Sequence, residues 1–255
     1  GIVAFLGFSL FHKYSDSTKQ DLKALMCEAD IIAPRDTKSI EILRDIFSEK
    51  KFSEILKRIL FEGTDLAFWA KWKKKVSSNS NILGISVRKP EYATSEMLEK
   101  YVNYLRGVIQ EYLEKNAEGK VRLFSLSEGV KADHRVSKKI IEGLPSATRE
   151  KIEHVIYDGN TADIKQALRQ CNLVICTRLH AMISCIAMQI PFVPIIYEVK
   201  MDHILDEVGY TSKKFSFNNL TGLKEHLDKL LKAVELGSMQ GKNVILWDMA
   251  KLQNY

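Results

Sequence analysis

The sequence predicts an α/β fold in which doubly wound parallel sheets form two successive units. Short apolar stretches alternate with amphipathic ones along almost the whole chain, which is typical of strands alternating with helices. Several apolar stretches, such as Leu173–Cys176, are continuous, as in strands buried on both faces of a parallel sheet. The apolar pattern lapses across Lys71–Asn81, where we expect a linker. We therefore predict one domain at residues 1–78 and a second at residues 79–255.

The first unit begins with a predicted strand at Ile2–Leu6, followed by a helix at Lys19–Glu28. A second short strand at Asp30–Ala33 leads into a helix that starts near Ser39. The stretch Phe52–Phe61 fits either a helix or a strand. The sequence begins with a segment that is typical of a buried strand, and it has no initiator Met. We therefore expect this unit to be incomplete at its N-terminus.

The second unit contains a longer series of the same elements. Its predicted strands are Ile82–Val87, Val121–Leu126, Val155–Tyr157, Leu173–Cys176 and Phe192–Tyr197. Helical spacing of apolar residues lies between them, at Leu98–Tyr112, Ser137–Ile141, Thr161–Gln170 and from Leu179 to Pro191. From about Leu220 onward the pattern is mainly helical, so the unit is expected to end in a helical segment.

Composition narrows the class of protein. The chain has 255 residues, a net charge of +6 and 45% hydrophobic residues, which is typical of a globular protein with its own core. The locally basic run Lys71–Lys75 is interpreted as a solvated linker, because no zinc-finger, basic-zipper or RNA-binding pattern accompanies it. A nucleic-acid partner is therefore not expected.

The cysteines and the apolar runs bear on cellular location. None of the four cysteines forms a CxxC pair, so we interpret all four as small buried residues in a reducing compartment. No apolar run approaches the roughly 18 residues of a membrane span. The expected location is the cytoplasm, with peripheral membrane association as an option. Because zinc-protease, Walker A and dinucleotide-binding motifs are all missing, we predict no metal and no cofactor.

Candidate functional residues follow from one rule of parallel α/β sheets, in which ligands bind beyond the carboxyl ends of the strands. Charged and polar residues stand directly after four predicted strands. They are Arg35 and Asp36, then Arg88, then Arg178 and His180, and finally Tyr197, Glu198 and Lys200. All are expected to converge on one cleft.

The strongest of these is Thr177-Arg178-Leu179-His180. Thr177 is expected to cap the following helix, whose free N–H groups and dipole favour an anion. Arg178 supplies a planar cation suited to phosphate or carboxylate, and His180 supplies a proton near neutral pH. The competing interpretation makes His180 a packed helix residue and Arg178 an ordinary surface cation.

Other polar segments are weaker candidates. Asp133-His134-Arg135 fits a functional site and a solvated helix start equally well. Asp65 is either a helix cap or a cleft acid, and the cap is slightly favoured. Ser184 and His180 are four residues apart and could share a hydrogen bond, but no third residue completes a catalytic triad.

Several segments together resemble the polysaccharide pyruvyl transferase family. They are Ala29–Ser39, Gly63–Phe68, Leu83–Arg88 and above all Cys171–Lys200. The last combines Arg-x-His after a strand, a helix of small residues, a proline, an apolar strand and Tyr-x-x-Lys. Two features depart from the family pattern: the upstream Gly-rich opening is missing, and Glu198-Val199 replaces Asp-Pro.

The resemblance implies a GT-B-like fold of two Rossmann-like domains, the second binding the donor. It implies phosphoenolpyruvate as donor, a glycan or lipid-linked oligosaccharide as acceptor, and a pyruvate ketal as product. It places Arg88, Arg178 and His180 in catalytic positions. Arg35, Asp65, Tyr197 and Lys200 are predicted to bind substrate.

Two other functions fit the same residues. A GT-B glycosyltransferase that uses a nucleotide sugar would need the same architecture and a similar phosphate site. A non-catalytic anion-binding domain that assembles with partners would need the cations but not the turnover.

Overall fold

A computed structural model describes residues 1–10, 14–59, 81–127 and 133–235 of the chain. It contains two compact units, one within residues 1–71 and the other within residues 72–251, and each is described by itself. Most of the predicted linker, and with it the predicted domain boundary after residue 78, lies outside the described residues.

The first unit is built on two parallel strands, β1 (Ala4–Phe8) and β2 (Ile31–Pro34). Three helices accompany them: α1 (Asp16–Glu28), α2 (Thr37–Ile46) and α3 (Glu49–Leu56). The stretch that fitted both helix and strand is therefore helical over α3, up to Leu56.

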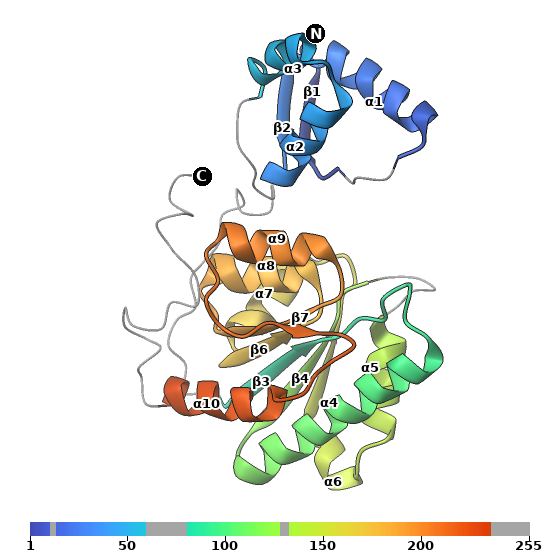
Figure 1. The fold of residues 1–255 in the computed structure, drawn as a ribbon. Coiled ribbons are helices and arrows are strands. Elements are labelled where there is room, and N and C mark those ends of the chain that lie inside the picture. The colour runs from blue at the N-terminus through green and yellow to red at the C-terminus, as the bar shows by residue number, and fades with distance from the viewer. Residues whose placement is uncertain (11–13, 60–80, 128–132, 236–255) are drawn as a thin grey trace. The chain divides into compact units, whose positions relative to one another are not determined.

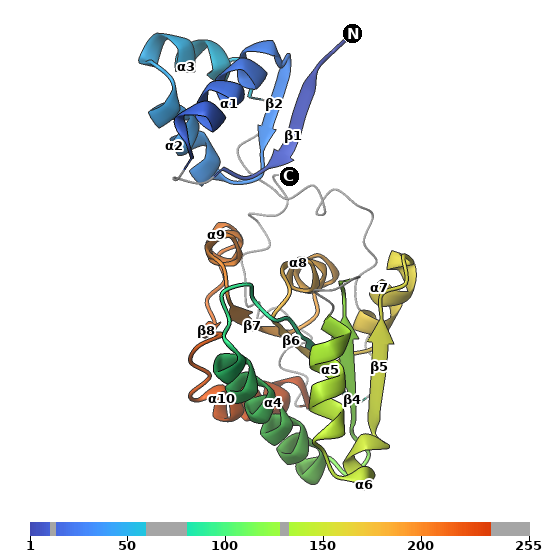
Figure 2. The same cartoon turned by 90° about the vertical axis from the view of Figure 1, so that its right-hand side faces the viewer.

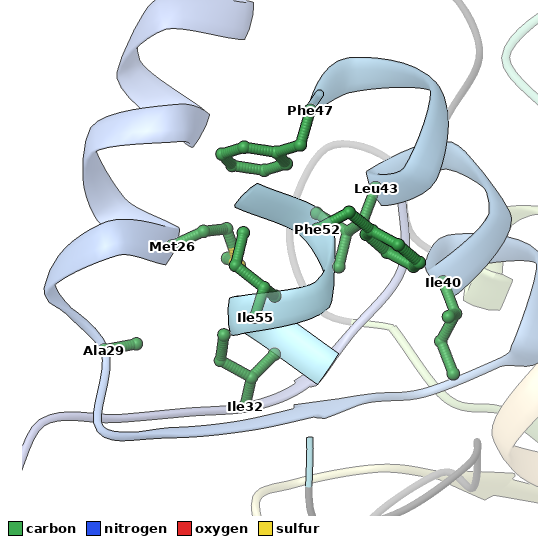
Figure 3. Packing of buried hydrophobic residues seen from close by; sticks show 8 residues of the cluster. All are labelled: Met26, Ala29, Ile32, Ile40, Leu43, Phe47, Phe52 and Ile55. Carbon is green, nitrogen blue, oxygen red and sulfur yellow. The ribbon is translucent and has the colours of Figure 1, made fainter. Parts of the chain in front are cut away.

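Apolar packing explains why α3 is a helix. Phe52 and Ile55 are three residues apart, so a helix places both on one face, and both are buried. They pack with Met26 from α1, Ile32 from β2 and residues of α2 in one hydrophobic cluster (Figure 3). A strand would have sent the two side chains to opposite faces.

The second unit contains a six-stranded parallel sheet. Its strands are β3 (Ile82–Ser86), β4 (Lys120–Ser125), β5 (Ile152–Ile156), β6 (Leu173–Cys176), β7 (Phe192–Ile196) and β8 (Phe215–Ser216). Their order across the sheet is β5-β4-β3-β6-β7-β8, and every neighbouring pair is parallel. This is the order of a Rossmann-type sheet.

Helices cover both faces of this sheet (Figures 1 and 2). On one face lie α4 (Ser95–Lys115), α5 (Asp133–Glu142) and α10 (Leu223–Glu235). On the other lie α7 (Thr161–Arg169), α8 (Leu179–Met188) and α9 (Val199–Glu207). The short α6 (Ser146–Arg149) precedes β5. The predicted α/β class with parallel sheets is confirmed.

The cysteine prediction is confirmed for three residues and wrong for one. Cys171, Cys176 and Cys185 are buried, but Cys27 is exposed, because α1 buries little beyond Met26. All four are free thiols. Across the described residues, no helix is both long and apolar enough to cross a membrane.

Candidate active site

The second sheet has a topological switch point between β3 and β6. The chain runs outward from β3 to β4 and β5, then returns to β6 on the other side of β3 and continues to β7. At such a point the connections leave in opposite directions and open a crevice beyond the strand ends. Arg88 stands two residues after β3, and Arg178 two residues after β6. The two predicted arginines therefore flank the switch point.

Hydrogen bonds hold the two strand ends together. The Thr177 N–H donates to the Ser86 carbonyl at 3.1 Å, and the Arg178 N–H donates to the Ser86 hydroxyl at 3.3 Å. The sheet register is thus extended past its last paired residues, Ser86 and Cys176. The backbone that carries Arg178 is fixed relative to the end of β3.

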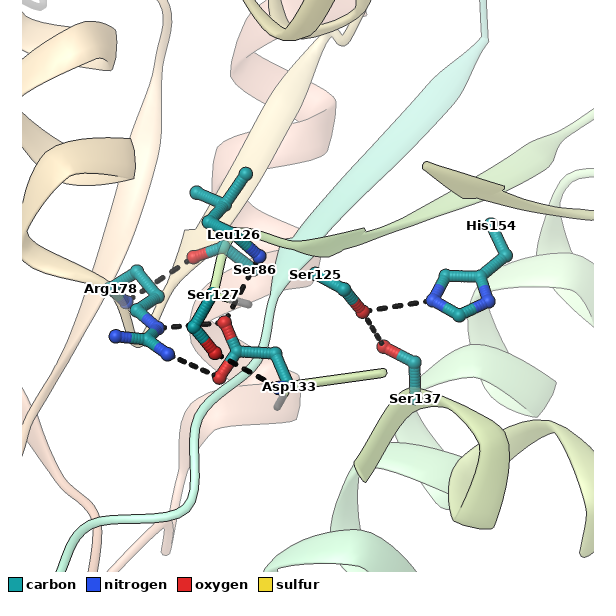
Figure 4. A network of polar contacts seen from close by, with 8 residues as sticks. All are labelled: Ser86, Ser125, Leu126, Ser127, Asp133, Ser137, His154 and Arg178. Carbon is teal, nitrogen blue, oxygen red and sulfur yellow. Dashed lines mark hydrogen bonds and ion pairs between the residues drawn. The ribbon is translucent and has the colours of Figure 1, made fainter. Parts of the chain in front are cut away.

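Arg178 makes a two-pronged ion pair with Asp133, the first residue of α5 (Figure 4). Its Nε donates to one carboxylate oxygen at 2.8 Å, and its Nη2 donates to the other at 2.5 Å. Asp133 is fully buried, whereas the Arg178 side chain is 16% exposed. The Leu126 N–H, just after β4, also donates to the Asp133 carboxylate at 3.0 Å. Asp133 is therefore not a solvated helix start, and it joins the end of β4 to the end of β6.

Arg88 has a different environment. Its guanidinium lies over the ring of Tyr197, 4.6 Å from the ring centroid, which is a cation–π contact. Its buried Nε has no hydrogen-bond partner within the described part of the chain. Among the residues that the structure describes, no carboxylate forms an ion pair with Arg88 like the one that Asp133 forms with Arg178.

Thr177 does not cap α8 as expected. The N-cap of α8 is Arg178, and its own side chain makes no capping hydrogen bond. The Thr177 hydroxyl instead shares a 2.8 Å hydrogen bond with the Tyr101 hydroxyl, and both residues are buried. Burial raises the pKa of Tyr101, so this hydroxyl stays protonated. A tertiary partner that lies 76 positions away replaces the local cap.

A second cluster follows β7. Lys200 Nζ lies 3.0 Å from Glu198 Oε2, and Tyr197 immediately precedes Glu198 in the chain. Burial raises the pKa of Tyr197, and Glu198 raises it further, while the charges of Arg88 and Arg178 act in the opposite direction. The other carboxylate oxygen of Glu198 is buried and has no partner among the described residues.

His180 is exposed in the first turn of α8, two residues after Arg178. The Ser184 hydroxyl donates to the backbone carbonyl of His180 at 2.7 Å. That bond is made within the helix and does not involve the imidazole, so it does not form the side-chain dyad considered from the sequence.

Two predicted residues of the first unit, Arg35 and Asp36, lie within the described residues. The Arg35 N–H donates to the Phe8 carbonyl, just after β2. Asp36 caps α2, with its carboxylate accepting from the Ser39 N–H at 2.8 Å. Asp65 lies outside the described residues. The structure therefore places Arg88 over Tyr197 and Lys200 beside Glu198, while the backbone of Arg178 is bound to Ser86 at the neighbouring strand end.

The sequence did not single out Tyr101 as part of this site. It did name Glu198 among the strand-end residues and Asp133 as a weaker candidate. Asp133 and Glu198 both follow strand ends, so the same rule gave a signal for them. Tyr101 carried none, because it stands in the middle of α4 with the spacing of a core residue. Within the described ranges, no group of three His, Cys, Asp or Glu side chains is placed to hold a metal ion.

Comparison with known families decides the classification. The profile of the polysaccharide pyruvyl transferase family matches residues 2–199, well over half of the 255 residues. The chain belongs to this family. The family is one of transferases, and the match includes β6, Arg178 and His180. No curated protein matches the chain.

Solved structures agree on the fold of this pyruvyl transferase family member. A protein described as a UDP-N-acetylglucosamine 2-epimerase from Listeria monocytogenes matches 99% of the chain with 13% identity and a TM-score of 0.62. A UDP-GlcNAc 2-epimerase from Methanocaldococcus jannaschii matches 98% with 13% identity and a TM-score of 0.55. The chain spans 65% and 62% of these two proteins. At such low identity the likeness shows the fold alone, which is GT-B-like.

Proposed function

We propose that this protein transfers a pyruvyl group from phosphoenolpyruvate to two hydroxyls of a sugar in a cell-surface polysaccharide or its lipid-linked precursor. The family match is the observation that carries the proposal. In the balanced reaction, C2 of the donor forms bonds to two sugar oxygens and its bond to the phosphate oxygen breaks. One of the two hydroxyl protons goes to the methylene carbon, which becomes a methyl group, and the other leaves with the phosphate.

The donor has the charge pattern that the switch point would complement. Phosphoenolpyruvate carries a phosphate and a carboxylate, and Arg88 and Arg178 flank one topological switch point. Arg88 supplies a cation whose Nε has no hydrogen-bond partner among the described residues. The first turn of α8 adds backbone N–H groups that the side chain of its N-cap residue, Arg178, does not cap. The second unit is therefore proposed as the donor-binding domain, and these groups would stabilise the departing phosphate.

His180 is proposed as the general acid or base. The reaction needs a proton delivered to carbon and protons removed from hydroxyls, and an imidazole titrates near neutral pH. His180 is exposed and lies two residues from Arg178, so a substrate held at the crevice is within reach of the same turn.

The remaining predicted residues are proposed to bind substrate. Tyr197 and Lys200 surround Glu198 next to Arg88, in the second unit. Arg35 and Asp65 belong to the first unit and are proposed for the acceptor glycan. Peripheral membrane association, suggested by the net charge of +6, would bring the protein to a lipid-linked acceptor.

The test is phosphate release by purified protein incubated with phosphoenolpyruvate and candidate glycans. We expect acceptor-dependent release together with a ketal on the glycan, detected by mass spectrometry. His180→Ala should lower turnover by about 10²–10⁴-fold, the usual contribution of a general acid–base group. His203→Ala on α9 is the matched control and should retain turnover. Equal turnover by wild type and His180→Ala would refute the catalytic assignment.

Two outcomes would favour the other functions. Turnover of a nucleotide sugar without any use of phosphoenolpyruvate would indicate a glycosyltransferase. Anion binding without turnover, and full biological activity of His180→Ala and Arg178→Ala, would indicate a non-catalytic binding domain.

A further inference from the structure

The Arg178–Asp133 pair uses two of the three nitrogens of the guanidinium group. Nε and Nη2 both donate to Asp133, and Figure 4 shows the third nitrogen, Nη1, pointing away from that carboxylate. The carboxylate is itself held by the Leu126 N–H, and the Asp133 N–H donates to the Ser127 hydroxyl at 3.1 Å. The orientation of Arg178 is therefore set from the end of β4, across the sheet from its own strand.

Stability alone does not account for such a pair. Taking two charges out of water costs several kcal/mol per ion, and well-packed apolar residues of similar volume are often as stable or more so. Another buried arginine in the same sheet has a partner with a smaller desolvation cost. Arg122 donates from Nε and Nη2 to Glu153, whose side chain is 55% exposed. Asp133, by contrast, is fully buried at the carboxyl edge where the candidate site lies.

We propose that Asp133 is a positioning residue for the transferase reaction and holds Arg178 with Nη1 directed toward the donor. The proposal rests on the proposed function. Because Asp133 neutralises the charge of Arg178 in the free protein, Arg88 supplies most of the attraction that binds the donor. Arg178 contributes mainly when negative charge develops on the departing phosphate, provided that its guanidinium is already in place.

This division of roles predicts separate effects on kcat and KM. Asp133→Asn keeps the shape of the side chain and an acceptor for Leu126, but it removes the charge and one acceptor for Arg178. The released Arg178 is still a cation and is no longer neutralised, so the KM for phosphoenolpyruvate should not rise as much as threefold. The kcat should fall at least tenfold, because Arg178 is no longer held for the transition state.

The experiment compares wild type, Asp133→Asn, Arg178→Lys and the double variant by steady-state kinetics. If Asp133 acts through Arg178, Asp133→Asn should lower kcat at least threefold less in the Arg178→Lys background than in wild type. Glu153→Gln is the matched control: it weakens another buried arginine pair near the amino end of β4 and should leave kcat within twofold of wild type.

Three results would overturn the inference. They are an unchanged kcat for Asp133→Asn, fully multiplicative effects in the double variant, and an equal loss with Glu153→Gln. If Asp133→Asn does not fold, Asp133→Glu keeps the charge but displaces the guanidinium by a methylene. It should lower kcat at least threefold, and an unchanged kcat would count against the inference.

Failure of the proposed function gives a different signature. Wild-type protein would then release no phosphate from phosphoenolpyruvate with any acceptor. The same four proteins would be compared by calorimetric binding of inorganic phosphate. If the effect of Asp133→Asn on the Kd for phosphate differs at least threefold between wild type and Arg178→Lys, the positioning role is retained. If the two substitutions change the free energy of binding additively, the positioning role is overturned.

Discussion

Removing Arg178 should destabilise the protein as well as inactivate it. Arg178→Met leaves a fully buried Asp133 carboxylate that retains a 3.0 Å bond from the Leu126 N–H but loses its two bonds at 2.8 and 2.5 Å. An uncompensated buried charge costs about 3–5 kcal/mol. Since domains are commonly stable by about 5–15 kcal/mol, this is a large fraction of the total.

The assay is urea unfolding followed by circular dichroism at pH 7. A second variant separates charge from packing: adding Asp133→Asn to Arg178→Met removes the stranded charge and keeps an acceptor for Leu126. The double variant should recover at least half of the lost free energy of unfolding. A cost below about 1 kcal/mol for Arg178→Met, or a further loss in the double variant, would show that the ion pair is not what the geometry indicates.

Three further predictions concern stability. Burial lowers the pKa of His154 and His226, so the unfolded chain binds more protons than the folded protein. The free energy of unfolding should therefore fall as the pH drops below 6.5, the ordinary pKa of histidine. The fall should be shallower in His154→Gln. Gly84→Ala should cost about 1–3 kcal/mol in urea unfolding, because its Cβ would lie 2.9 Å from Cys171 Sγ in the central strand. Gln189 ends α8 with a φ of 59°, so Gln189→Gly should raise the unfolding midpoint by an amount equivalent to about 0.5 kcal/mol.

Each of these has an opposing result. The contribution of His154 is the difference between the pH dependence of wild type and that of His154→Gln. If this difference shows no loss of unfolding free energy as the pH is lowered from 7 to 5.5, the histidine prediction is contradicted. If Gly84→Ala is as stable as wild type, the Cys171 side chain must move aside for the added methyl group at no cost. A lower midpoint for Gln189→Gly would mean that the side-chain contacts of Gln189 outweigh the strain of its backbone.

Much of the fold could be predicted from local patterns. The β6 strand has the predicted bounds, Leu173–Cys176, because a fully apolar run between polar residues leaves little choice. The two-residue β8 was not predicted, since so short a strand has no periodicity to detect. The segment at Phe52 could not be assigned from the sequence, because its apolar residues fit the spacing of a helix and that of a strand. The residues that pack against Phe52 and Ile55 decide for the helix.

The candidate site, too, could be predicted only in part from the sequence. The rule of strand ends identified Arg88 and Arg178 in advance. It did not show that Arg178 pairs with Asp133 rather than with water, because the burial of a carboxylate depends on what packs over it. The interpretation of Thr177 as a cap was wrong for a related reason: the Tyr101 hydroxyl takes the place of a local partner.

The sequence by itself determined the alternation of strands and helices, the parallel class and the residues that follow each strand, because these depend on neighbours within a few positions. Only the tertiary structure decided that β3 and β6 are adjacent, so that Arg88 and Arg178, 90 positions apart in the chain, flank one switch point. It also decided the partner of each arginine. Strand order and buried charge pairs arise from contacts between distant segments, which no local pattern of residues encodes.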